Sequence, residues 1–425
     1  MPRARQSLMP LCLSVMLFFC PGLAGANNVS TANLNQSPSP FPLPAGLESS
    51  VEFWKKVFSQ FGLAQLIYFD PLDLSKIYEV NDVGEASRSN EYINSERARI
   101  AAANNVDMER VKAQRGVKER TAAGIKRSGR YISQIKEIFK NRGLPPELAY
   151  LPIVESSYDI NARSSVGALG IWQFMPRTGR QYLRMGRGID ERRDPLESSR
   201  AAASYLNEAY DNLGSWPLAI TSYNFGQAGM ARAVAEVGSN NIVDLIEKYN
   251  HPYWGFPPQQ FYAEFLAAVE IGTSLSRYFP GLELDPAAEI KEVEIPRGAS
   301  LAALVKSSGL NRDEFLGWNP ALSPATQVVP AGYRMKLPAN ASAEPLVAEV
   351  KNPVMQAKAS TSPGPTNVKE SKERAQVVHH RVKQGETLYE IARRYGASVQ
   401  RIIQVNGIRQ SHQLRVGSTL RIPQV

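Results

Sequence analysis

One stretch of the chain, residues 148–173, places a single carboxylate at the end of an apolar helical face. Its sequence is LAYLPIVESSYDINARSSVGALGIWQ. Leu148, Leu151 and Val154 recur at the spacing of one helix face, so we expect this face to be buried. Glu155 follows directly, and its side chain should therefore lie at the edge of an apolar core. A buried carboxylate without a partner is costly to ionise, because it loses its hydration.

The expected surroundings of Glu155 suit proton transfer. Burial raises the pKa of a carboxyl group, so that the group keeps its proton near neutral pH, as a general acid must. Downstream, Trp172 offers a flat face of the kind that stacks on sugar rings, and Gln173 supplies both a hydrogen-bond donor and an acceptor. The alternative is that Glu155 ends a helix in a solvated turn and that Trp172 belongs to the core. Spacing alone does not decide between these two interpretations.

Three short motifs follow one another in the chain and carry a family resemblance. They are Glu155-Ser-Ser-Tyr158, Gly167-x-x-Gly170-x-x-Gln173 followed by Phe174-Met175-Pro176, and Ser222-Tyr223-Asn224-Phe225-Gly226. In this order and at these separations they resemble the motifs of the soluble and membrane-bound lytic transglycosylases, which share the goose-type lysozyme fold. The resemblance implies that Glu155 is the catalytic acid.

The resemblance also implies a reaction and a set of substrate-binding residues. Lytic transglycosylases cleave the β-1,4 bond between N-acetylmuramic acid and N-acetylglucosamine in peptidoglycan, and they leave a 1,6-anhydro end. By this resemblance Glu155 first protonates the glycosidic oxygen and then removes the proton from the muramic C6 hydroxyl. The positions that match the family's substrate-binding residues are Ser164, Gln173, Met175, Tyr223, Asn224 and Tyr262.

Other interpretations remain open. A goose-type lysozyme on the same fold would add water, and a second carboxylate in the cleft would favour it; no acidic residue stands in a matching motif near Glu155. A wall-binding protein with an inactive catalytic domain would lack Glu155 or Gln173, and both are present. Three site positions also have plain structural interpretations, which are core for Met175, a helix face for Tyr262 and a turn for Ser164.

The periodicity of the chain predicts one large helical domain preceded by shorter regions. Residues 128–280 contain segments of helical periodicity separated by short Gly and Pro turns, which indicates a mainly α-helical, lysozyme-like catalytic domain. Before it we expect a signal peptide (1–26), a flexible leader (27–46) and an N-terminal helical region (47–127). The signal peptide is indicated by basic residues near the start, an apolar run and a small-x-small cleavage site.

Beyond residue 280 the chain contains a weak internal repeat, residues 289–338 and 379–425. The two copies align Gly298 with Gly385 and Asn319 with Asn406. Their shared pattern is a strand, two short helices and a strand, which makes a small α+β (βααβ) unit. The second copy resembles a LysM domain, a module that binds glycans containing N-acetylglucosamine, and the first is a degenerate copy. Residues 339–378 between them are predicted to be a disordered linker.

Charge and cysteine content limit the partners of the chain. It has 49 basic and 40 acidic residues, and residues 379–425 hold eight basic and only two acidic ones, which favours attraction to anionic wall polymers. Its two cysteines, Cys12 and Cys20, lie in the predicted signal peptide, so we expect no metal site and no cofactor. We expect an exported protein of the periplasm or cell envelope that binds peptidoglycan glycan strands and no nucleic acid. Peripheral association with the outer membrane is left open.

Overall fold

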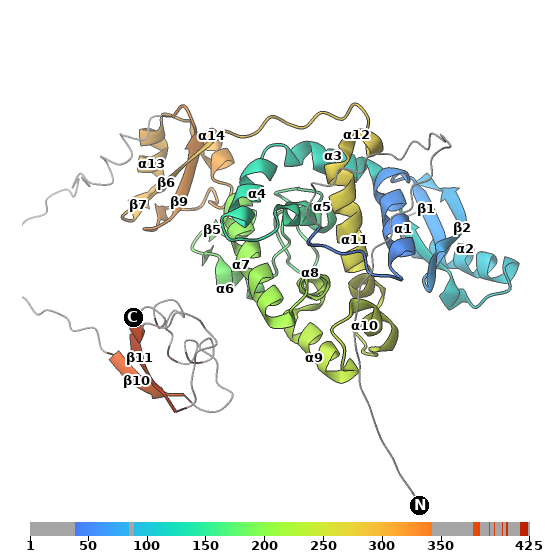
Figure 1. Ribbon diagram of the computed structural model, residues 1–425. Helices are drawn as coiled ribbons and strands as arrows, with labels where there is room; N and C mark the ends of the chain where they lie inside the picture. Colours follow the sequence, from blue (N-terminus) through green and yellow to red (C-terminus); the bar gives the residue numbers. More distant parts are fainter. Residues whose placement is uncertain are drawn as a thin grey trace, which may run out of the picture. The chain divides into compact units, whose positions relative to one another are not determined.

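The computed structural model describes residues 39–84, 89–341, 377–382 and 417–423 and five further positions of the C-terminal region, Ile391, Tyr395, Ile402, Val405 and Asn406 (Figure 1). The chain divides into two compact units, residues 1–354 and 355–425, and each is described by itself. The predicted signal peptide and most of the predicted linker, residues 342–376, lie outside the described residues. Among the described residues, no helix combines the length and the apolar character that a membrane span requires.

Residues 39–47 are part of the packed structure of the first unit. The ring of Phe41 is buried and meets the rings of Trp216 and Phe265 edge-on, at centroid distances of 5.6 and 4.9 Å. The carbonyl oxygen of Pro42 accepts a hydrogen bond of 2.8 Å from the hydroxyl of Tyr262. The prediction of a flexible leader is therefore wrong for residues 39–46, because this segment supplies an aromatic side chain to the core.

The region predicted to be helical, residues 47–127, also contains an antiparallel sheet of order β2-β1-β3. Its elements are α1 (Glu48–Ser59), β1 (Gln65–Asp70), β2 (Asp73–Asp82), α2 (Asn90–Ala103), η2 (Met108–Arg110), β3 (Lys112–Arg115) and α3 (Lys118–Ser128). The prediction failed at β1 because its sequence, QLIYFD, is a short apolar run that periodicity cannot separate from a buried helix turn. Alternate residues of β1 face two cores: Ile67 and Phe69 join the core that contains α1, and Leu66 and Tyr68 pack with α2.

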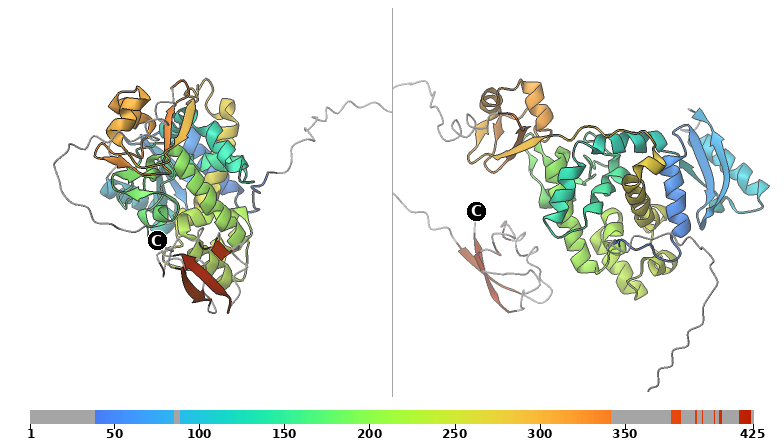
Figure 2. Two further views of the ribbon diagram at one scale, coloured as in Figure 1. Left: turned by 90° about the vertical axis from the view of Figure 1, so that its left-hand side faces the viewer. Right: turned by 45° about the horizontal axis from the view of Figure 1, so that its top comes forward.

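The catalytic region is mainly α-helical, as predicted. Its elements are α4 (Ile132–Lys140), η3 (Pro146–Tyr150), α5 (Leu151–Ser156), α6 (Pro176–Tyr182), β4 (Met185–Gly186), β5 (Ile189–Asp190), η4 (Glu191–Arg193), α7 (Pro195–Leu213), α8 (Trp216–Phe225), α9 (Gln227–Val237), α10 (Ile242–Lys248), α11 (Phe256–Thr273) and α12 (Leu275–Tyr278). The long helix α11 packs against α8, α5 and η3 on one side and against α1 on the other, so that α1 separates it from the sheet (Figures 1 and 2).

Residues 289–341 form a small module with its own core. The elements are β6 (Ile290–Glu294), β7 (Ala299–Ser300), α13 (Leu301–Ser308), α14 (Arg312–Trp318), β8 (Val328–Val329) and β9 (Arg334–Pro338). Two short strands, β7 and β8, are added to the predicted order of a strand, two helices and a strand. Strands β6 and β9 pair antiparallel, with Val293 opposite Met335. Leu304, Phe315 and Leu337 are buried in the module core, which the hairpin residue Ile189 of the catalytic region also joins.

The described part of the second unit has the same framework. Strands β10 (Val377–Arg381) and β11 (Thr419–Pro423) pair antiparallel around a small core that includes Ile391 and Ile422. One asparagine makes the same contacts in both copies. In the first copy, the amide of Asn319 donates to the carbonyls of Phe315 and Lys336 and accepts from the N–H of Lys336, at 2.8–3.0 Å. In the second copy, Asn406 bonds the carbonyl of Ile402 and both backbone groups of Arg421.

We predict that Asn319→Ala destabilises the first module. The substitution leaves the N–H and the carbonyl of Lys336 without their partner, which costs about 1–3 kcal/mol for an unsatisfied buried group. Hydrogen exchange of the β9 amides should speed up accordingly, while exchange in α11 should not change. The matched control is Asn240→Ala at an exposed position. Equal exchange rates in the two variants would contradict a structural role for this asparagine.

Candidate active site

Glu155 lies in the last turn of α5, where the chain reverses sharply. The two residues that follow the helix, Ser157 and Tyr158, both adopt left-handed backbone conformations, with φ of 52° and 56°. Each such non-glycine residue costs roughly 1–3 kcal/mol, so the turn needs support from its surroundings. Tyr158 supplies part of that support, because its ring is buried and its hydroxyl donates to the carbonyl of Ala149.

Helix α3 closes the other side of this turn. The side chain of Arg127 donates to the carbonyl of Ser157 at 2.6 Å. Gly124 packs directly on the same residue, and a Cβ at this position would lie 2.7 Å from the Ser157 carbonyl oxygen. A larger residue at position 124 would therefore displace the turn. The backbone at the end of α5 is thus held from both sides.

The carboxyl group of Glu155 is predominantly protonated at neutral pH. Its side chain is only partly exposed, and burial together with the charge of Glu264 raises its pKa to about 8. The direction of the shift is the one that the sequence predicted. Tyr223 belongs to the same site, because burial and the charge of Glu155 raise the pKa of its phenol well above the usual value. A protonated carboxyl group in this setting can act as a general acid.

Glu264 of α11 is a second acidic residue near Glu155, and the expectation that no such residue exists is wrong. Burial raises the pKa of Glu264 to about 8 as well. Sequence motifs missed it because it comes from a helix far along the chain and outside the three motifs. The same signal that marked Glu155 also marks Glu264, since it is a lone acid between Ala263 and Phe265, both of which are buried.

The loop after the turn is held by the residues that the sequence placed in the site. The hydroxyl oxygen of Ser164 accepts from the N–H of Ala168 at 2.9 Å. The amide of Gln173 donates to the carbonyls of Ala162 and Gly170, at 3.1 and 2.8 Å, and Gln173 itself has a φ of 48°. Ser164 and Gln173 thus shape the loop through side-chain contacts with its backbone. Their contacts with substrate stay a prediction.

Gly170 of this loop is required by close backbone packing. Its φ is 78°, and a Cβ would lie 1.9 Å from the carbonyl oxygen of Arg192. The turn of Glu155 and the loop are joined by the hydroxyl of Ser156, which donates to the carbonyl of Ile171 at 2.8 Å. Met175 follows the loop with 41% of its surface exposed, so it is available to a ligand and is not a core residue.

Tyr223 and Asn224 lie in the last turn of α8, on the other side of the loop. The hydroxyl of Tyr223 donates to the carbonyl of Trp172 at 2.8 Å, and its ring contacts Phe174 at a centroid distance of 5.8 Å. Asn224 is exposed. The structure therefore brings Tyr223 together with Glu155 and with the loop that contains Gln173. The contribution of Asn224 to binding stays a prediction.

Two aromatic residues have structural roles in the fold. Trp172 is fully buried, and its indole N–H donates to the hydroxyl of Ser199 at 2.8 Å. The suggestion that its face stacks on a sugar ring is therefore wrong, and the alternative that it belongs to the core is correct. Tyr262 is also buried, with its hydroxyl on the carbonyl of Pro42. Its hydroxyl oxygen can still accept a hydrogen bond, and a substrate role for Tyr262 stays a prediction.

Within the described part of the chain, no cluster of three or more His, Cys, Asp or Glu side chains is arranged to hold a metal ion.

Two segments of the chain match known protein families. Residues 133–246 match the family described as Transglycosylase SLT domain, and residues 380–423 match the family described as LysM domain. The first segment is therefore similar to SLT transglycosylase domains, and the second is similar to LysM domains. The SLT segment ends before α11, so the position of Glu264 beside the site comes from the structure alone.

A longer part of the chain, which includes more than the SLT segment, is similar to membrane-bound lytic murein transglycosylase D of Escherichia coli K12. The two are 29% identical over 303 residues, which is 69% of this chain and 63% of that protein. The chain thus spans less than two thirds of the length of this curated relative. Among solved structures, the lytic transglycosylase Slt of Pseudomonas aeruginosa is 22% identical with a TM-score of 0.29, covering 36% of this chain and 25% of its own. The 70 kDa soluble lytic transglycosylase of Escherichia coli is 20% identical with a TM-score of 0.28, covering 35% and 25%.

We predict that Glu264→Gln shifts the pH dependence of activity toward acid. The charge of Glu264 raises the pKa of Glu155, so its removal lowers that pKa, and Glu155 loses its proton at a lower pH. The alkaline limb of the kcat/KM profile should therefore move to lower pH, with little change below pH 6. The matched control is Glu247→Gln, at an exposed position on α10. An alkaline limb that stays in place would contradict the coupling of the two carboxyl groups.

We also predict that Glu155→Gln stabilises the protein at alkaline pH. The folded-state pKa of Glu155 is about 8, above its usual value of 4.5, so between these values the carboxyl group ionises in the unfolded state but keeps its proton in the folded state, and stability falls as pH rises. The amide variant lacks this effect. Its Tm should exceed that of the unmodified protein by a few degrees more at pH 8.5 than at pH 4.5, as measured by calorimetry. A difference in Tm that is the same at both pH values would argue against a buried, uncharged carboxyl group.

Proposed function

We propose that the chain is a lytic transglycosylase that cleaves the glycan strands of peptidoglycan between N-acetylmuramic acid and N-acetylglucosamine. The observation that carries the proposal is the carboxyl group of Glu155, which lies at a helix end in the segment that matches the SLT family and has its pKa raised to about 8. A group of this kind is protonated at neutral pH and can donate to a leaving oxygen.

The reaction needs two proton transfers at the same residue. Glu155 donates its proton to the glycosidic oxygen as the bond to the muramic anomeric carbon breaks. The 2-acetamido group of the substrate stabilises the developing oxocarbenium centre. The ionised Glu155 then takes the proton of the muramic C6 hydroxyl, whose oxygen attacks the anomeric carbon and closes the 1,6-anhydro ring. A pKa near the working pH suits both steps, because the group must first donate and then accept.

Residues around Glu155 would bind and orient the sugar. Met175, directly after the loop that contains Gln173, and Asn224, in the last turn of α8, are both exposed. Ser164 and Gln173 hold the loop, and Tyr223 lies within electrostatic range of Glu155. We propose that these residues, together with Tyr262, line the substrate cleft.

A hydrolase on the same fold is the second candidate, because Glu264 adds a second carboxyl group near Glu155. Glycosidases with two carboxylates keep one protonated as the acid and the other ionised as base or nucleophile. Here burial raises both pKa values to about 8, so neither group is predominantly ionised at neutral pH. This pattern favours the single-glutamate reaction over hydrolysis.

The LysM domain would hold the enzyme on its substrate. We propose that residues 380–423 bind the N-acetylglucosamine units of the same glycan strands, so that the local concentration of cleavable bonds at the catalytic domain rises. The substrate is a polymer of the cell envelope, so we propose that the chain is exported there by the signal peptide predicted at residues 1–26. The proposed envelope location agrees with the membrane-bound relative in Escherichia coli.

The test of this proposal is mass spectrometry of the soluble products from purified sacculi. The mature protein should release products lighter by about 18 Da, the mass of one water, than those of a hydrolase, and Glu155→Gln should release at least 100-fold less. A matched control is Glu247→Gln, which should digest sacculi like the unmodified protein.

Each other result has a definite meaning. Products with reducing muramic ends would identify a lysozyme-type hydrolase. Full activity of Glu155→Gln would overturn the assignment of the catalytic acid. Binding to sacculi without any product would leave a wall-binding protein, and the proposed reaction would be wrong.

A further inference from the structure

The module of residues 289–341 is fixed to the catalytic region by buried charges. Lys336 of β9 lies 2.8 Å from Asp194 and 2.8 Å from Glu197 at the start of α7, and the three side chains are only 3%, 2% and 6% exposed. Arg334 adds a hydrogen bond of 2.8 Å to Glu197. These cations lower the pKa of Glu197 to about 2 despite its burial. Removal of one partner would leave a buried charge uncompensated, which is strongly destabilising, so these ion pairs hold the module in one position on α7.

Backbone contacts continue this interface along the β4–β5 hairpin. The N–H of Asp190 donates to the carbonyl of Ala321, and the N–H of Ser323 donates to the carbonyl of Gly188, both at 2.8 Å. Ile189 inserts into the module core. The module is therefore an integral part of the first unit.

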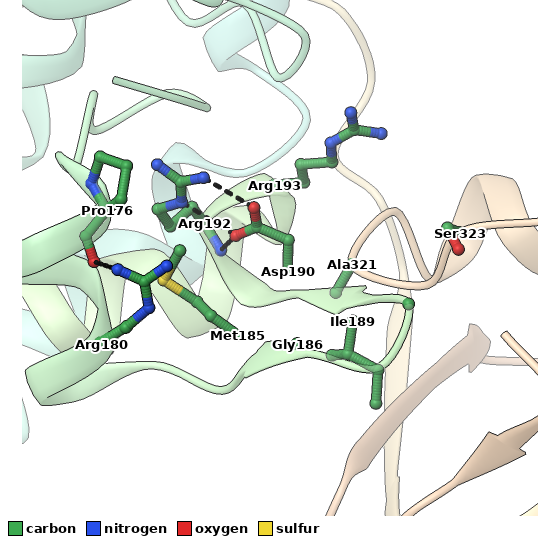
Figure 3. Close-up of a pocket in the computed structure, with 11 residues that line it drawn as sticks. Pro176, Arg180, Met185, Gly186, Ile189, Asp190, Arg192, Arg193, Ala321 and Ser323 are labelled. Atoms are coloured by element: carbon green, nitrogen blue, oxygen red, sulfur yellow. Dashed lines mark hydrogen bonds and ion pairs between the residues drawn. The ribbon is translucent and has the colours of Figure 1, made fainter. Parts of the chain in front are cut away.

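A cavity of about 440 Å³ lies where α6, the hairpin and the module meet (Figure 3). Its volume lies within the range of small-molecule sites, about 300–1,000 Å³, and exceeds what a single small ion needs. Its lining includes Pro176, the residue that follows Met175 of the candidate active site in the chain. From the module it includes Ala321 and Ser323. The cavity is thus lined by residues of both the catalytic region and the module.

The lining of this cavity carries an excess of positive charge. Asp190 is neutralised by Arg192, which donates to its two carboxylate oxygens at 2.9 and 2.8 Å and is itself buried. Arg180 and Arg193 are exposed and lie on either side of this pair in Figure 3. Among the described residues, neither of these two arginines has a carboxylate partner. Two uncompensated guanidinium groups around one cavity favour a ligand with more than one carboxylate.

We propose that this junction cavity binds the acidic peptide carried by the muramic acid units of the substrate, with Arg180 and Arg193 contacting its carboxylates. The inference rests on the proposed function, because that function supplies a glycan whose peptide side chains bear free carboxylates. It assigns to the degenerate repeat a role as one wall of a substrate subsite. The role requires no glycan binding by that repeat.

The variant that tests the inference is Arg180→Glu/Arg193→Glu, which reverses both charges at exposed positions. The matched control is Arg120→Glu/Arg232→Glu, which changes the net charge equally at exposed positions outside the cavity lining. Thermal unfolding of both variants checks that they fold.

Activity is measured on glycan strands that carry their peptides and on strands stripped of them by an amidase. We compare the kcat/KM on peptide-bearing strands, divided by the kcat/KM on stripped strands, with the same ratio of the unmodified protein. This ratio should be about tenfold lower in the cavity variant and within twofold in the control. The effect should shrink as salt rises from 50 to 500 mM, because exposed charge pairs are screened. A ratio that is unchanged in the cavity variant, or that falls equally in the control, overturns the inference.

A binding measurement separates this inference from the proposed reaction. A soluble disaccharide peptide with free carboxylates, and the same compound with amidated carboxylates, are titrated into the full chain by calorimetry. The free acid should bind at least tenfold more tightly than the amide, and the cavity variant should lose this preference. Equal affinities overturn the peptide subsite even if the enzyme is active. A retained preference supports it even if the products in the sacculus digest are hydrolytic.

Discussion

The turn that ends α5 places the carboxyl group of Glu155 where burial favours its neutral form over its ionised form. The loop and helices of the catalytic region pack around this turn. Ser157 and Tyr158, which follow the helix, both have left-handed backbone conformations. The buried ring of Tyr158 and the close packing of Gly124 hold the backbone in this turn. The loop that contains Gln173 then packs on this turn through Ser156. Burial of Glu155 lowers stability at neutral pH, and the same burial supplies a protonated acid, a trade-off that is common at functional sites.

Much of this site was accessible from the sequence, for identifiable physical reasons. Local signals were sufficient where neighbouring residues in the sequence decide the outcome. The apolar face before Glu155 predicted its raised pKa. The aligned Asn319 and Asn406 predicted a repeated unit, and each forms hydrogen bonds with the last strand of its copy. Signals failed where the outcome depends on distant contacts. Glu264 reaches Glu155 from another helix, and Trp172 is buried by packing that a motif does not reveal. The strand β1 was missed because a short buried strand has no period of its own to detect.

The two copies of the repeat differ in how they connect to the rest of the chain. In the first copy, the buried Lys336 contacts Asp194 and Glu197 at the start of α7, and the partly exposed Arg334 also contacts Glu197. The same Asp194 also caps that helix by accepting from the N–H groups of Leu196 and Glu197. This copy is therefore part of the catalytic body. The second copy belongs to a separate unit and matches the LysM family, so two related modules serve the same chain in different ways.

The protonation state of Glu155 is the central claim, and it can be measured without substrate. Carbon-13 NMR of protein labelled at the glutamate carboxyl carbons, with the Glu155 signal assigned by its loss in Glu155→Gln, gives its titration directly. We predict an apparent pKa near 8, coupled to a second titration from Glu264. A single titration of Glu155 near its usual pKa of 4.5 would mean that the group is ionised at neutral pH and would contradict its role as the acid.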